Sequence, residues 1–109
     1  MDLNFQQPIA QRTLIGRQGA TVEVKLGAPK PFDQSNPQSG WYCPFRVEDI
    51  DGQPWVAFAG GADGVHALVL ALVRIGEYLG SRPDLELTFD GSKDLGFLSL
   101  KLLSNAAEG

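Results

Sequence analysis

The chain has 109 residues, of which 43% are apolar and 20% are charged, and its net charge at pH 7 is −4. This length and composition predict one globular domain that buries a core without disulfides or metal ions. The acidic balance argues against general binding to nucleic acid or to an anionic membrane, because both need a basic face.

The cellular location is predicted from features that the sequence lacks. Cys43 is the only cysteine, so an internal disulfide is excluded, which fits a reducing compartment. The first residues do not show the basic stretch and apolar core of a signal peptide. Charged side chains interrupt the most apolar stretch, residues 62–79, too soon for a membrane span. We therefore expect a soluble, cytoplasmic protein.

The first part of the chain predicts a hairpin followed by a long loop. A polar segment, residues 1–8, precedes a single domain over residues 9–103. Strands are expected at residues 9–16 and 20–26, and the second of them alternates apolar and polar residues, as a half-buried strand does. Residues 27–40 contain three prolines and two glycines, and loops of this length are usually functional or mobile.

Phe32 is the aromatic residue of this loop. It either pins the loop to the core or stands exposed for a partner.

A second hairpin is expected from strands at residues 41–50 and 54–59, because Asp51-Gly52 is a strong turn signal. The apolar face of the first of these strands carries Trp41, Cys43, Phe45 and Val47. Pro44 lacks a backbone N–H and therefore marks either an edge strand or a bulge.

Residues 62–79 show the only sustained helical periodicity in the chain. The broad apolar stripe predicted to face the core consists of Val65, Val69, Leu72, Gly76 and Leu79, flanked by Leu68, Val73 and Ile75. Asp63 is expected to cap the start of the helix, and Gly80 to end it. Gly76 lies inside the stripe, which indicates either a close approach of the helix to the sheet or a hinge.

The opposite side of this helix carries Leu70, Arg74 and Tyr78, together with Ala67. An apolar leucine beside a tyrosine on a polar side is a candidate contact patch for a partner.

After the helix, a strand is expected at residues 85–89. Residues 95–103 are apolar enough for a final strand or a short helix, and a strand through about residue 100 is favoured. Residues 104–109 are expected to be a disordered tail. The element order is therefore β-β-β-β-α-β-β. The short connections predict a mainly antiparallel sheet with one long helix packed on one face, which is a two-layer α+β fold.

Several short motifs resemble a known family. They are Trp41-Tyr42-Cys43-Pro44, the stretch from Gly61 to Leu68, Gly91, and Leu95-Gly96-Phe97. Over roughly residues 9–98 the chain resembles a family of small bacterial single-domain proteins known only as a domain of unknown function. The family pattern Asp-x-x-Gln-Ala-Leu at the helix start has His66 in the glutamine position here. The resemblance implies a compact bacterial protein and supplies no activity.

His66 is the single histidine, and Asp63 precedes it by three residues, so the two lie on neighbouring turns. Such a pair can move protons, but it has no nucleophile at a motif-defined position. Cys43 follows the apolar phase of its strand and is expected in the core. One histidine, one cysteine and scattered carboxylates make no zinc pattern, and cofactor motifs are absent, so we expect neither a metal nor a cofactor.

Gly60 and Gly61 precede the helix start and can approach an anion with backbone N–H groups. With Asp63 and His66 they form a candidate ligand site at one end of the sheet. The simpler interpretation is a permissive turn from strand to helix, because the charge of Asp63 opposes a phosphate.

Three functions remain open. The one we expect is a small non-enzymatic protein-binding module of the immunity, antitoxin or inhibitor type, because the chain is small and acidic and lacks a catalytic set. Its contact residues would be Leu70, Arg74, Tyr78 and Phe32. The alternatives are a small-molecule or peptide-binding domain with a site near Gly60–His66, and a structural protein that forms a homodimer through an edge strand.

Overall fold

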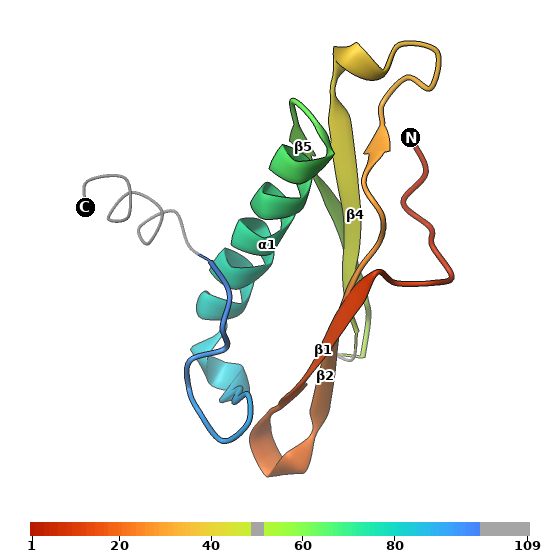
Figure 1. Cartoon of the computed structure of the whole chain (residues 1–109). Coiled ribbons are helices and arrows are strands. Elements are labelled where there is room, and N and C mark those ends of the chain that lie inside the picture. Colours follow the sequence, from red (N-terminus) through yellow and green to blue (C-terminus); the bar gives the residue numbers. More distant parts are fainter. Residues whose placement is uncertain (49–51, 99–109) are drawn as a thin grey trace, which may run out of the picture.

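The computed structural model describes residues 1–48 and 52–98 (Figure 1). Residues 49–51, where the predicted hairpin turn begins, and residues 99–109 lie outside the described part. An antiparallel sheet and one long helix confirm the predicted α+β class. The elements are β1 (Ala10–Ile15), β2 (Thr21–Leu26), β3 (Lys30–Pro31), β4 (Trp41–Glu48), β5 (Trp55–Gly61) and α1 (Gly64–Gly80).

Strand β4 is the centre of the sheet. It pairs with β5 on one side and with β2 and then β3 on the other, while β1 pairs with β2. Leu26 pairs with Phe45, and Lys30 pairs with Tyr42. The chain advances four residues from Leu26 to Lys30 but only three residues along β4 between the partners. The extra residue makes a bulge between β2 and β3.

Pro44 was predicted to mark either an edge strand or a bulge. It lies on the central strand, opposite this bulge, so the second interpretation is correct. The Gly27 N–H donates to the Pro44 carbonyl, with an N···O distance of 2.8 Å. Pro44 has no N–H to return, and the Gly27 carbonyl instead accepts a hydrogen bond from the Cys43 thiol at 3.4 Å. The proline therefore leaves no unsatisfied carbonyl at this point of the ladder.

The buried side of α1 agrees only in part with the predicted stripe, with Ile75 and Leu79 in common. The residues buried there repeat every four positions: Ala67, Ala71, Ile75 and Leu79, each between 0% and 3% exposed. Val65, predicted to be buried, is 72% exposed. The predicted position of the buried side around the helix was wrong because the prediction placed Ala67 on the polar side, whereas small side chains allow a helix to approach a sheet closely.

Among the described residues, no helix has both the length and the apolar character that crossing a membrane requires.

Gly76 does mark a close approach, but its neighbour is not the sheet. A Cβ atom at Gly76 would lie 2.7 Å from the Leu98 carbonyl oxygen and 2.8 Å from the Phe97 Cβ. Residues 97–98 therefore lie directly against α1. Figure 1 shows this part of the chain returning along the helix on the side away from β4 and β5.

The predicted strand at residues 85–89 does not form. Pro83–Leu85 make a 3-10 helix, and Glu86 has a left-handed φ of 51°, which interrupts an extended chain. A single antiparallel bridge joins Thr88 to Ile15 at the edge of β1. The strand predicted at residues 95–100 is also absent over residues 95–98, and its end lies outside the described part.

Arg12 on β1 holds this returning segment instead of a strand ladder. Its guanidinium donates to the Leu95 carbonyl at 2.8 Å and lies 4.2 Å from the centroid of the Phe89 ring and 5.2 Å from that of Phe97. Cation–π contacts of this kind stabilise a segment without requiring a regular backbone.

The face of the sheet opposite α1 is partly covered by residues 1–8. The Tyr42 hydroxyl donates to the Asp2 carbonyl and accepts from the Asp2 N–H, each at 3.1 Å. Arg46 donates to the Phe5 carbonyl at 2.9 Å, and its guanidinium lies 4.3 Å from the centroid of the Phe5 ring. We call this side of the sheet the outer face.

Candidate functional site

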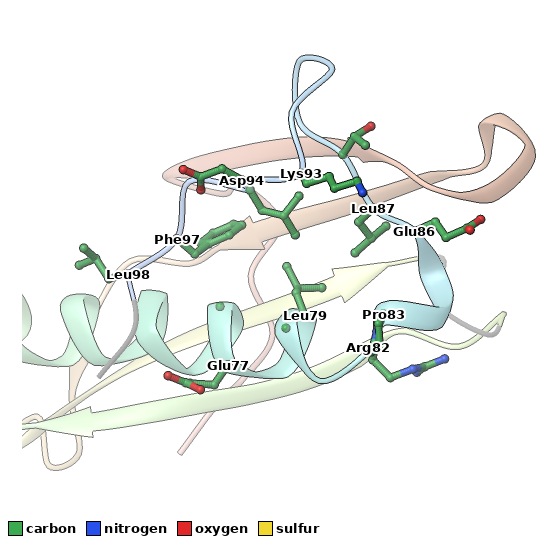
Figure 2. A pocket seen from close by; sticks show the side chains of 14 residues that line it. Glu77, Leu79, Arg82, Pro83, Glu86, Leu87, Lys93, Asp94, Phe97 and Leu98 are labelled. Carbon is green, nitrogen blue, oxygen red and sulfur yellow. The ribbon is translucent and has the colours of Figure 1, made fainter. Parts of the chain in front are cut away.

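A groove of about 900 Å³ opens between the C-terminal end of α1 and residues 82–98 (Figure 2). Its apolar lining residues, besides glycines, are Leu79, Pro83, Leu87, Leu95, Phe97 and Leu98. Its charged lining residues are Glu77, Arg82, Glu86, Lys93 and Asp94. Small-molecule sites in proteins commonly have volumes of roughly 300 to 1,000 Å³, so the groove has the size of a ligand site.

Most charges around the groove already have partners on this chain. Arg82 binds Asp84 with an Nη2–Oδ2 distance of 2.9 Å, and its hydrogen bond lowers the pKa of Asp84 below the usual range. Glu86 lies 3.4 Å from Arg17. Asp94 accepts a hydrogen bond from the Gly96 N–H at 2.9 Å.

Lys93 differs from these residues. It forms no ion pair with any residue in the described part of the chain.

A second cavity, of about 200 Å³, lies between β1, β2 and α1, where Arg12, Leu72 and Phe97 are among its lining residues. The sequence predicts neither of these cavities, because its patterns indicate strands at residues 85–89 and 95–100. A signal was present in Gly76 and Gly80, which lie four residues apart on α1 and both line the larger groove. Gly76 admits residues 97–98 directly against the helix, and the space beside Gly80 is open.

The candidate ligand site at Gly60–His66 is a well-formed helix start. Asp63 Oδ1 accepts from the His66 N–H at 2.8 Å, which confirms the predicted cap. His66 Nδ1 accepts from the Ala62 N–H at 2.9 Å, so the two side chains satisfy backbone donors reciprocally. Neither of the two cavities described above is lined by Gly60, Gly61, Asp63 or His66.

The predicted contact residues of α1 lie against the sheet. Tyr78 stacks on Trp55 with a centroid distance of 4.1 Å, and Leu70 is partly buried against the core. The Arg74 guanidinium donates to the Phe58 carbonyl on β5 and lies 5.6 Å from the centroid of the Trp55 ring. The side of α1 that carries Leu70 and Tyr78 is therefore used for packing.

Phe32 combines both of its predicted interpretations. Its ring lies 5.3 Å from that of Tyr42 and 6.2 Å from that of Phe58, measured between centroids, so it fastens the loop to the outer face. Phe32 is nevertheless 45% exposed. Val56, which shares a face of β5 with Phe58, is 44% exposed. We call Phe32, Val56 and Phe58 the outer patch.

The family of the protein follows from its sequence. A family model described as a domain of unknown function, DUF6968, matches residues 10–99. The chain belongs to the DUF6968 family. Neither the curated proteins nor the solved structures contain a significant match to this chain. The function proposed for this DUF6968 domain therefore rests on its geometry.

Cys43 is a core residue of this DUF6968 domain, as its sequence position predicted. Its side chain is 0% exposed, and burial raises the pKa of the thiol to about 11. A thiol reacts as the thiolate, so Cys43 has little nucleophilic character at neutral pH. Within residues 1–48 and 52–98, histidine, cysteine and carboxylate side chains form no cluster of three or more that could hold a metal ion.

Proposed function

We propose that this DUF6968 protein is a non-enzymatic protein-binding module that contacts its partner through the outer patch. The observation that carries the proposal is Phe32, which stays 45% exposed although two aromatic rings hold it in place. Large apolar side chains that are both exposed and fixed are typical anchors of protein interfaces.

The outer patch has a rigid base. Tyr42 beneath it is 4% exposed, and its hydroxyl is tied to Asp2 on the N-terminal segment. Tyr42 and Phe58 meet edge to face, with centroids 6.3 Å apart and an interplanar angle of 84°. A surface that is ordered before binding loses less conformational entropy when a partner arrives, which favours its use as an interface.

The proposal shifts the expected contact from the helix to the outer face. Leu70 and Tyr78 contribute to the packing of α1, whereas Phe32 is both exposed and close to the β5 edge. Arg74 is exposed at this edge and can flank the interface. The proposed class of partner is the one inferred from the sequence. This DUF6968 protein would bind another protein in the way that an immunity protein, an antitoxin or an inhibitor binds its target. A bacterial, cytoplasmic setting belongs to the same proposal and is supported by the family resemblance and the unpaired buried cysteine.

Native mass spectrometry of the protein purified gently from its own cells tests the proposal. The patch variants are Phe32→Ser and Val56→Glu. We expect the fold to tolerate a glutamate at position 56, because this position is 44% exposed and Arg46 lies opposite it on β4. The matched control is Val65→Glu, which makes the same change at a 72% exposed valine on α1. Circular dichroism melting establishes that each variant is folded.

The expected result is a stoichiometric second protein with the unchanged chain and with Val65→Glu, and its loss with both patch variants. A bare monomer from the unchanged chain, or a partner that both folded patch variants retain, would overturn the proposal.

A further inference from the structure

We propose that the groove between α1 and residues 82–98 binds an apolar carboxylate, that is, a single carboxylate attached to an aliphatic or aromatic body. This inference is independent of the protein-binding proposal, because the groove lies on the α1 side of the sheet and the outer patch lies on the other side.

The floor of the groove is apolar. In Figure 2, Leu79 rises from α1 toward Leu87 on the opposite wall, and Phe97 lies on the other side of Leu79. Aliphatic and aromatic side chains that face each other across an open volume of about 900 Å³ provide contacts for an apolar body. Burial of that body would supply the main driving force for binding.

Lys93 is the cationic side chain that lies over this floor. Figure 2 shows the Lys93 side chain lying along the mouth of the groove toward Leu87, whereas Glu77, Arg82 and Glu86 point away from the space between the walls. Lys93 has no ion-pair partner among the described residues, so its ammonium group is available for a ligand. A carboxylate at this position would accept a charge-assisted hydrogen bond from it.

The remaining rim charges select a monoanion. Arg82 is engaged by Asp84, so among the described lining residues Lys93 is the cation left to compensate a ligand charge. Asp94 is also part of the lining, and its carboxylate repels a second negative charge on the ligand. A carboxylate with one charge therefore fits the groove better than a phosphate with two.

Gly80 provides a way to close the groove without disturbing the fold. It lines the groove, and a Cβ atom at this position would meet no atom within 4 Å. Its φ is not among the positive values of the chain, so a side chain can be added there without backbone strain. Gly80→Phe places a bulky ring beside the groove, and Gly80→Ala is the matched control that leaves the volume open.

The test is a titration of the full chain, labelled with ¹⁵N, with octanoate, octanol and octylamine, followed by amide chemical shifts. We expect octanoate to shift the amide signals of Gly76, Gly80 and Lys93 in a saturable way, and to bind about tenfold more tightly than octanol, because a charge-assisted hydrogen bond contributes about one factor of ten. Lys93→Gln should remove this tenfold advantage without changing octanol binding, whereas Lys30→Gln, on β3, should retain it.

Gly80→Phe should weaken both octanoate and octanol at least tenfold, and Gly80→Ala should leave both unchanged. Three results would each overturn the inference: octanoate shifts confined to residues outside the groove, equal binding of octanoate and octanol, or tighter binding of octylamine than of octanoate. An unchanged preference for octanoate in Lys93→Gln would remove Lys93 as the recognising group.

Discussion

The backbone of Gly61, the last residue of β5, lies directly against the backbone of Ala67 in the first turn of α1. A Cβ atom at Gly61 would be 2.5 Å from the Ala67 nitrogen and 2.8 Å from the His66 carbonyl carbon. Both distances are too short for atoms that are not bonded to each other. The absence of a side chain at position 61 therefore sets how closely the helix approaches the sheet.

Gly61→Ala should lower the free energy of unfolding by about 1–3 kcal/mol, the usual range for overpacking, because the atoms in the way are backbone atoms that cannot rotate aside. Urea unfolding followed by circular dichroism measures the change. Gly80→Ala is the control: it adds the same methyl group in open space and should be neutral or stabilising by up to about 1 kcal/mol. Equal unfolding free energies for the two variants would contradict the close contact at Gly61.

Tyr78 should act as a packing residue. Its ring stacks on Trp55 at 4.1 Å, so Tyr78→Ala removes a large half-buried ring and should cost about 2–3 kcal/mol of unfolding free energy. Tyr78→Phe keeps the stack and should retain most of the stability. Urea unfolding followed by tryptophan fluorescence measures both. If Tyr78→Ala unfolds at the same urea concentration as the unchanged protein, the stacked ring contributes nothing to the fold.

Arg74 should protect an exposed sheet edge. Its guanidinium covers the Phe58 carbonyl on β5, a strand that contains no proline and pairs in the described part of the chain with β4 alone. Charged side chains on an edge strand oppose pairing between copies. Arg74→Met should therefore self-associate more strongly than the unchanged protein in sedimentation-velocity experiments at increasing concentration.

Arg74→Lys retains a cation and should behave like the unchanged protein in the same experiment. Identical sedimentation of the methionine and lysine variants would show that Arg74 does not restrain the edge. The comparison also tests the predicted homodimer, since its contact would use this strand or β1.

Glu48 should contribute stability that acid removes. The Lys25 amino group donates to Glu48 at 2.8 Å, and this hydrogen bond, together with Arg46 at 2.9 Å, lowers the pKa of the carboxyl below its ordinary value of 4.5. The stabilisation is complete above pH 4.5 and is lost as the pH falls through the lowered pKa of the folded state.

Unfolding free energies measured in urea between pH 7 and pH 3 should therefore decline less steeply for Glu48→Gln than for the unchanged protein. Part of the decline should persist, because the pKa values of Asp33 and Asp84 are also lowered, by hydrogen bonds from Ser35 and Arg82. Superimposable pH profiles for Glu48→Gln and the unchanged protein would rule out a contribution from this carboxylate.

Local patterns in the sequence determined most of the sheet and the start of the helix. Alternating residues predicted β2 and β4 close to their observed bounds, because a strand repeats every two residues whatever packs on it, and the Asp51-Gly52 turn signal predicted the returning strand β5. Asp63 predicted the cap for a similarly local reason, since its partner N–H lies three residues away. The apolar phase of β4 also predicted that Cys43 is buried.

Only the tertiary structure decided which side of α1 faces the sheet and where residues 82–98 lie. The helix is apolar on two sides, so its periodicity alone does not separate the side packed on β5 from the side packed on Phe97. The positions of the glycines decide which side packs where. Gly61 allows the helix to pack closely on the sheet, and Gly76 allows residues 97–98 to pack closely on the helix. Arg12 then holds the returning chain through contacts across more than 80 positions, and the groove beside Lys93 is a product of that long-range packing.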